Sequence, residues 1–335
     1  MSRISRFQIA SLKKLFAVAL LCLMCLLLAK VDAAAAPAKN VILMISDGQG
    51  YNTVQATNYY TDVTPAYETF PAQYGMTTYM LLGDGTPWGY DPVEAWADFD
   101  YVKSNPTDSA AAATAIYTGQ KTYSGSIGMD FDRESLVSIA QMASTYGKAT
   151  GAVSSVQFTH ATPAAVAAHN VSRNNYAEIA NEMIYSSDLD VIMGGGHPEY
   201  DANGDARLPA GYSYSYVGGE STWLDLRAGT AGGANPWDLI ESKSDFEDLA
   251  DGTLVLDRVV GVPEVYRTLQ YDRDWADPND DGVYVDPFIA TMPSLETMTK
   301  GALNVLSADP DGFFVMIEGG AVEWANPGND LGRMI

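Results

Sequence analysis

The chain has 335 residues, of which 47% are apolar and 18% are charged, so it is long enough to bury one large core or two smaller ones. Its formal net charge of −23 predicts a surface that repels nucleic acid, which excludes DNA and RNA as expected partners. Beyond about the first forty residues, nothing in the composition is typical of a disordered or a repeat protein.

The chain begins with a segment that has the features of a secretory signal peptide. Basic residues at positions 3, 6, 13 and 14 precede an apolar run at 15–29, and small residues follow at 33–36. That run is short for a membrane-spanning helix, and a retained anchor is the alternative interpretation. We expect residues 1–36 to be removed on export, which leaves a periplasmic or secreted protein without membrane attachment.

Removal of this segment changes what the remaining chain can do. Cys22 and Cys25 both lie within it, so the mature chain has no cysteine for a disulfide or a metal site. The segment also holds five of the 19 basic residues and one of the 42 acidic ones, so the mature chain is still more acidic.

The rest of the chain alternates between predicted strands and helices. Strands are predicted at 40–46, 148–156, 190–193 and 312–317, and helices at 134–146, 174–185 and 295–306, with a short alanine-rich helix that Pro163 opens and Thr162 caps. The first strand is apolar throughout, as in a strand buried on both faces. This alternation predicts an α/β fold, with a mostly parallel central sheet flanked by helices on both faces.

The domain organisation follows from the same pattern. Residues 37–335 are predicted to form one partial domain, incomplete at its C-terminus, and residues 198–290 to be an irregular acidic insertion that decorates the sheet. Several polar residues come at strand ends or helix starts, namely Asp47, His160, Thr162 and Glu318. In parallel sheets these positions meet at one edge, where ligands bind.

A serine at a predicted helix start is the strongest local signal. Ser109 follows Asp108 and precedes four alanines, which favours a helix that begins at the serine. The free N–H groups of such a helix start attract an anion, and small neighbours let a phosphate approach the backbone. On local physics alone, the favoured interpretation is that Asp108 or Ser109 caps a packed helix.

The surrounding motifs resemble those of the alkaline phosphatases. The segment 107–115, Thr-Asp-Ser-Ala-Ala-Ala-Ala-Thr-Ala, resembles the nucleophile motif of that family. Residues 41–50 resemble its first strand with a metal-binding Asp-Gly-x-Gly, residues 160–173 resemble its Thr-Pro and substrate-arginine segment, and residues 313–320 resemble its Glu-Gly-Gly strand. The four motifs come in family order across residues 40–335, so the resemblance is specific.

The resemblance implies hydrolysis of small phosphate monoesters through a phosphoserine on Ser109. Arg173 would clamp two phosphate oxygens and Asp108 would position both of these residues. Asp47, Thr162 and Glu318 would bind Mg²⁺, with Asp47 bridging to Zn²⁺, while His160 would lie beside the magnesium ligands and adjust how tightly the ion is held. The family also implies two zinc ions and a homodimer.

The zinc ligands are where the match fails. The mature chain has three histidines, of which His169 is predicted to pack and His197 to lie in a loop. Glu323 stands where the family has a zinc-binding aspartate and is able to ligate, but Pro327 stands where it has a histidine. The chain stops within an evident helix. We therefore expect a fragment of a phosphatase or the product of a truncated gene, not competent on its own.

Two further functions are weighed against this one. Residues 277–286, from Asp277 to Asp286, resemble a Ca²⁺-binding loop without its final glutamate, and an acidic turn is the alternative. A related sulfatase or diesterase is disfavoured, because the residues after Ser109 lack a sulfatase pattern and Arg173 would occupy the place of a second ester. The remaining alternative is an exported, non-catalytic protein that binds phosphate or calcium.

Overall fold

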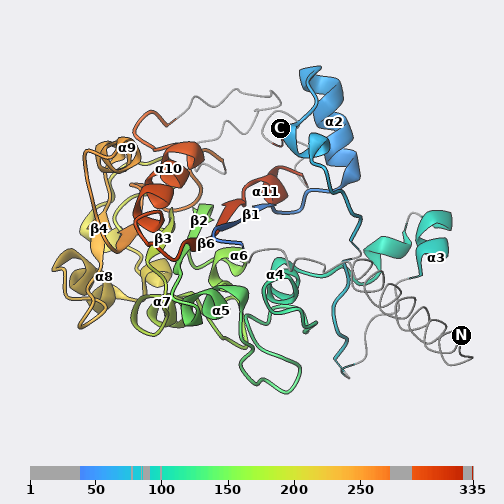
Figure 1. Cartoon of the computed structure of the whole chain (residues 1–335), viewed down its shortest axis with the longest axis horizontal. Helices are drawn as coiled ribbons and strands as arrows, with labels where there is room; N and C mark the ends of the chain where they lie inside the picture. The colour runs from blue at the N-terminus through green and yellow to red at the C-terminus, as the bar shows by residue number, and fades with distance from the viewer. Residues whose placement is uncertain are drawn as a thin grey trace, which may run out of the picture. The chain divides into compact units, whose positions relative to one another are not determined.

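Six strands form one parallel sheet in the order β1-β6-β2-β3-β5-β4 (Figure 1). The computed structural model describes residues 38–76, 78–83, 85, 91–98, 100–271, 289–326 and 334. The strands are β1 (Val41–Ser46), β2 (Ala149–Gln157), β3 (Val191–Gly195), β4 (Asp238–Ile240), β5 (Val259–Gly261) and β6 (Phe313–Gly319). The expected signal peptide, the calcium-like loop at 277–286 and Pro327 lie outside the described residues.

The described helices connect these strands. They are α2 (Tyr51–Thr61), α3 (Pro92–Ala97), α4 (Ser109–Thr118), α5 (Ile139–Thr145), α6 (Ala161–Ala164), α7 (Tyr176–Tyr185), α8 (Glu220–Arg227), α9 (Lys243–Asp251), α10 (Leu295–Leu306) and α11 (Val322–Ala325). Short 3₁₀ turns occur at Ala66–Thr69, Tyr101–Lys103, Pro209–Gly211 and Ser215–Val217. The predicted α/β class with a parallel sheet is confirmed.

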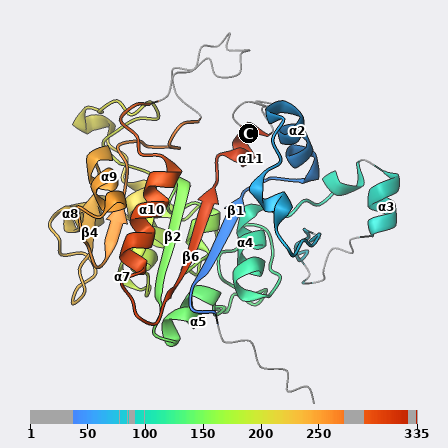
Figure 2. The same ribbon diagram turned by 45° about the horizontal axis from the view of Figure 1, so that its top comes forward.

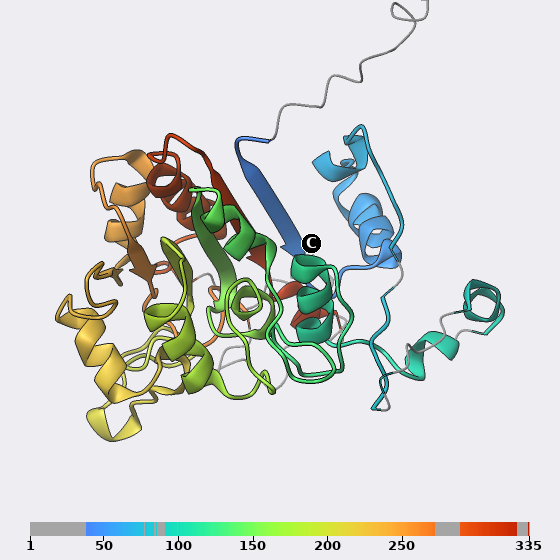
Figure 3. The same ribbon diagram turned by 60° about the horizontal axis from the view of Figure 1, so that its bottom comes forward.

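Alternate side chains of the strands point into two separate apolar clusters, one on each face of the sheet. Phe314 and Met316 of β6 belong to the cluster that includes residues of α4 to α8, whereas Val315 and Ile317 pack with α9 and α10. This alternation with a period of two is the geometry of a strand with both faces covered. Figure 3 brings the helices of the first cluster forward, and Figure 2 shows α10 on the opposite side. Helices on both faces are thus confirmed.

The first strand differs from its prediction. We expected β1 to be buried on both faces, but the side chains of Ile42 and Met44 are 49% and 72% exposed. The reason is the strand order, because β1 lies at one edge of the described sheet with β6 as its strand neighbour (Figure 2). One face of β1 packs on the first cluster through Val41, Leu43 and Ile45. The other face is exposed because α10 covers β2 and β6 but does not extend over β1.

Two predicted helix starts are also corrected. The helix expected at 134–146 begins only at Ile139, because residues 129–135 form a tight turn closed by a bridge between Met129 and Ser135, and Ser138 then caps α5. Helix α6 begins at Ala161 with His160 as its cap, so Thr162 lies inside the helix instead of capping it.

The segment expected to be an irregular insertion is more regular than predicted. Residues 198–271 include α8, β4, α9 and β5, and both strands pair within the central sheet. Buried Trp223, Trp237 and Phe246 of this segment join the two apolar clusters. The segment therefore extends the sheet and its core, and three-residue strands were too short to be recognised as periodic patterns.

Gly128 packs against the helix that begins at Ser109 and donates a hydrogen bond to it. Gly128 has a φ of +59° and its N–H donates to Oγ1 of Thr114 in α4, while an added Cβ would overlap the carbonyl oxygen of Ala168. We expect Gly128→Ala to lower the free energy of unfolding by about 3 kcal/mol or more, from left-handed strain plus the clash. Gly119→Ala is the matched control, because Gly119 has a φ of +74° but open space around its Cβ position. Urea unfolding of both variants measures the difference, and equal losses would show that the clash is relieved.

Candidate active site

Ser109 lies at the first position of α4, as its sequence context predicts. The Asp108 carboxylate caps this helix by accepting from the backbone N–H of Ala111 at 3.0 Å. The Ser109 side chain is nearly buried, and its Oγ donates to Oδ2 of Asp47 at 2.9 Å and lies 3.3 Å from Oε2 of Glu323. A serine hydroxyl at a helix start is therefore held between two carboxylates.

Arg173 is fixed beside that helix start by the same aspartate. Oδ2 of Asp108 accepts from Nη1 of Arg173 at 3.1 Å and from the backbone N–H of Gly125 at 3.0 Å. The backbone N–H of Arg173 in turn donates to the carbonyl of Gly125 at 2.7 Å. These bonds orient a planar guanidinium, a group suited to two oxygens of one phosphate, next to Ser109.

The carboxylates of Asp47, Glu318 and Glu323 lie near the C-terminal edge of the sheet, near enough to one another for their charges to interact. Parallel pairing places Glu318 of β6 opposite Ile45 of β1 on one side and opposite Ser154 of β2 on the other. Asp47 comes directly after the last residue of β1, two residues beyond Ile45. Glu318 is fully buried, and its Oε2 accepts a hydrogen bond from the Ser154 hydroxyl. Its Oε1 is buried and has no hydrogen-bond partner within the described part of the chain.

The crowding of carboxylates changes their acidity. Burial, and then the charge of Asp47, raises the pKa of Glu318 to about 8, although the hydroxyls of Ser154 and Thr162 favour its ionised form. Burial and Asp47 likewise raise the pKa of Glu323 to about 7, against the opposing effect of Arg173. Excess negative charge in a buried site is what a bound cation neutralises.

The oxygen-rich half of this site fits Mg²⁺. Asp47, Thr162 and Glu318 present the oxygen donors that this ion prefers, and the orphaned Oε1 of Glu318 lacks a partner that a cation would supply. Among the described residues, no group of three or more His, Cys, Asp or Glu side chains is gathered closely enough to form a ready metal cluster. One of the expected ligands is a threonine, which such a group does not include. The three residues fit Mg²⁺ because all of their donor atoms are oxygens.

A pair of zinc ions does not fit the described residues, because two histidines are committed elsewhere. His169 hydrogen bonds to Glu182 and to the carbonyl of Leu136, each at 2.9 Å, which agrees with the predicted packing role. His197 lies in a loop, as predicted, but is fully buried and bonds to Glu241 at 3.2 Å. Neither ring contacts Ser109 or its carboxylates.

His160 borders the site on the side of Arg173. Its ring lies parallel to Tyr176 at 6.2 Å and edge-on to Trp324 at 5.6 Å between ring centroids. Burial, and then the charge of Arg173, lowers the pKa of His160 to about 4, so the ring is neutral at ordinary pH. The predicted effect of His160 on magnesium affinity stays a prediction.

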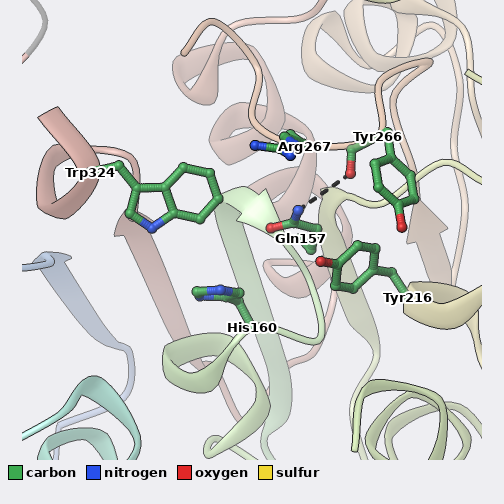
Figure 4. A pocket seen from close by; sticks show the side chains of 6 residues that line it. All are labelled: Gln157, His160, Tyr216, Tyr266, Arg267 and Trp324. Atoms are coloured by element: carbon green, nitrogen blue, oxygen red, sulfur yellow. Dashed lines mark hydrogen bonds between the residues drawn. The ribbon is translucent and has the colours of Figure 1, made fainter. Parts of the chain in front are cut away.

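A pocket beside this site was not predicted from the sequence. It has a volume of about 430 Å³ and is lined by Gln157, His160, Tyr216, Tyr266, Arg267 and Trp324 (Figure 4). Tyr216, Tyr266 and Arg267 come from the segment expected to be an insertion, and the sequence holds no signal that these distant residues meet. Gln157 lies at the end of β2, where a polar residue in an apolar strand was the one available sign.

Comparison with known proteins identifies similar sequences. A sequence model of the alkaline phosphatase family matches residues 38–334. Alkaline phosphatase 3 of Bacillus subtilis is 33% identical over 306 residues, which are 88% of this chain and 53% of that protein. The alkaline phosphatase of Escherichia coli is 28% identical over 322 residues, or 89% of this chain and 64% of that protein. The chain thus spans about half to two thirds of the length of these relatives.

Solved structures agree with the sequence matches. The cold-active alkaline phosphatase of a psychrophilic Shewanella sp. superimposes with a TM-score of 0.61 at 26% identity, covering 88% of this chain and 61% of that one. The alkaline phosphatase of the Antarctic bacterium TAB5 gives 0.56 at 25% identity, covering 88% and 71%. Within the described residues, no helix has both the length and the apolar character needed to span a bilayer.

Proposed function

Because this chain belongs to the alkaline phosphatase family, we propose that it has the site of a metal-dependent phosphomonoesterase in which Ser109 is the nucleophile. The observation that supports this most is the environment of the Ser109 hydroxyl. It lies at a helix start, hydrogen bonded to Asp47, within reach of Glu323 and beside the Asp108–Arg173 pair. An acceptor for its proton and a cation for the phosphate are thus in place together.

The proposed reaction has two steps. In the first, Oγ of Ser109 attacks phosphorus and its proton passes to a neighbouring carboxylate, while the bond from phosphorus to the ester oxygen breaks and that oxygen takes a proton from water to leave as the alcohol. In the second, water attacks the phosphoserine, which releases inorganic phosphate and restores the serine hydroxyl. Arg173 holds two nonbridging oxygens throughout, and the N–H groups at the start of α4 favour the developing negative charge.

Mg²⁺ is proposed to bind at Asp47, Thr162 and Glu318, where it would offset the negative charge of the carboxylates and the phosphate. A mutant of the TAB5 alkaline phosphatase has been solved with Mg bound in its M3 site, which supports a metal in this fold. Glu323 is proposed as a ligand of the zinc that the family implies, but no step is assigned to zinc because the described residues lack a full ligand set.

The test is a turnover assay combined with an acid-quench trap. The chain is incubated with p-nitrophenyl phosphate, Mg²⁺ and Zn²⁺ at alkaline pH, quenched in acid, and the peptide containing Ser109 is examined by mass spectrometry for one added phosphate. We expect a phosphoserine and slow turnover, well below that of an intact relative. Turnover equal to that relative's would refute the expected incompetence of this chain.

The main alternative predicts a different outcome of the same assay. A non-catalytic protein that binds phosphate or calcium would give no phosphoserine and no turnover, while calorimetry with orthophosphate or Ca²⁺ would still record binding. Absence of the trapped peptide together with such binding would therefore replace the enzymatic proposal. Export to the periplasm or medium and homodimerisation are part of the same proposal, which family membership supports.

A further inference from the structure

Two of the residues that line the pocket, Trp324 and His160, adjoin the candidate site around Ser109. Trp324 on the pocket wall directly follows Glu323, whose carboxylate lies 3.3 Å from Oγ of Ser109. The His160 ring, which also lines the pocket, lies parallel to the ring of Tyr176. Tyr176 follows Arg173 by three residues in the sequence. The pocket volume of about 430 Å³ is within the range of small-molecule sites.

Gln157 places an unused acceptor in this pocket. The residue is 2% exposed, and its Nε2 donates to the carbonyl of Tyr266 at 3.4 Å. That bond fixes the amide, because the reversed orientation would set two oxygens against each other. Oε1 therefore points into the space between Trp324 and Tyr216 (Figure 4), and it has no hydrogen-bond partner in the described structure. A buried acceptor of this kind favours a ligand that donates an N–H or O–H.

The walls of the pocket favour a flat ring. The Tyr216 ring is held by Tyr176 and Tyr266, with centroids 4.7 Å and 5.2 Å away, so its face is fixed before any ligand arrives. Trp324 faces it across the pocket, and the His160 ring is held edge-on to Trp324 (Figure 4). Fixed aromatic surfaces bind the face of a ring with little loss of side-chain freedom.

We propose that this pocket binds the ring of the substrate's alcohol moiety, and that Oε1 of Gln157 accepts a hydrogen bond from an amino group on that ring. The substrate class is then a nucleoside monophosphate whose base has an exocyclic amine, such as adenosine monophosphate. The inference rests on the proposed function, because it assigns this pocket to the ester that Ser109 attacks.

The test measures binding of the nucleoside alone, so it does not depend on turnover. Calorimetry on the full chain compares adenosine with purine riboside, which lacks the amine. We expect adenosine to bind about fivefold more tightly, as one hydrogen bond to a buried acceptor implies. Gln157→Met is expected to remove this preference, whereas Gln55→Met, at an exposed glutamine, retains it.

Equal affinity of the unchanged chain for the two nucleosides would overturn the inference, because it would mean that water alone satisfies Oε1. This outcome does not depend on whether the Gln157 variant folds. No binding of either nucleoside would overturn it as well. The proposed function is tested separately with glycerol phosphate, which has no ring. If the chain hydrolyses glycerol phosphate but does not prefer adenosine, only the assignment of the pocket is wrong. If it prefers adenosine but forms no phosphoserine, only the enzymatic proposal is wrong.

Discussion

Replacement of Ser109 by alanine is expected to abolish the slow phosphomonoester hydrolysis that we propose for this chain. The loss should be about 10³-fold or more, because among the residues that the structure describes no other hydroxyl is hydrogen bonded to both Asp47 and Glu323. Initial rates with p-nitrophenyl phosphate measure the loss, and the acid-quench trap should show no phosphate on the peptide that contains residue 109. Both readouts change together if Ser109 is the nucleophile.

The variant must also remain folded for this result to count. Ser109→Ala removes one hydrogen bond, so we expect it to cost about 1 kcal/mol of stability and to shift the midpoint of thermal unfolding by a few degrees. Ser307→Ala, at an exposed serine after α10, is the matched control and should leave the rate unchanged. Retention of half the wild-type rate by the Ser109 variant would contradict a nucleophilic role.

The second large effect concerns Glu318 in the absence of metal. Its pKa of about 8 in the folded chain lies above that of an unfolded glutamate, near 4.5, so the folded state binds more protons between these values. Its contribution to stability is therefore full below about pH 4.5 and is lost as the pH rises through 8. We expect the free energy of unfolding of the metal-free chain to fall by on the order of 3 kcal/mol from pH 5 to pH 8.

Glu318→Gln should remove most of that dependence. The amide is neutral at every pH, its oxygen can accept from Ser154, and its nitrogen takes the place of the unpartnered Oε1. The variant should be more stable than the wild type at pH 8 and show a shallower fall, because the pKa of Glu323 is also raised and still contributes. Urea unfolding in the presence of a chelator measures both slopes, and equal slopes would show that Glu318 is ionised at little cost.

Magnesium provides an independent readout of the same residue. Mg²⁺ at pH 8 is expected to raise the thermal midpoint of the wild type, because bound cation removes the cost of ionising Glu318, and to raise that of the Gln variant much less. If Mg²⁺ raises the thermal midpoint of both chains equally, the ion does not bind through the Glu318 carboxylate.

The sequence predicts those parts of the site that depend on local signals. Asp108 caps α4 and Ser109 begins it because the capping pattern is encoded within a few residues. Asp47 and Glu318 meet because each ends or nearly ends a strand of a parallel sheet, a rule that requires no knowledge of strand order. Asp47 accepts a hydrogen bond from Ser109 and Asp108 pairs with Arg173, while the roles that the resemblance implies for these residues stay predictions.

Features that depend on strand order or on distant pairs could not be predicted. The exposure of Met44 follows from the position of β1 at the sheet edge, which its own residues do not encode. The aromatic pocket requires Tyr216 and Tyr266 to meet the end of β2, across a segment whose short strands give weak patterns. The late start of α5 reflects the turn at residues 129–135, which a bridge and several backbone hydrogen bonds close outside the helix.

The position of β6 between β1 and β2 has a consequence for how the chain folds. Ser109 and Glu323 are 214 residues apart in the sequence, and the carboxylates assemble around the serine only after β6 has entered the gap between two strands made much earlier. Such distant contacts form slowly, because a long loop must close before they yield any stability. During synthesis β1 and β2 emerge before β6, so each exposes a strand edge that is prone to wrong pairing. The assembled site around Ser109 should therefore form as one of the last events in refolding, later than the burial of Trp223 and Trp237 on the side of the sheet away from β1.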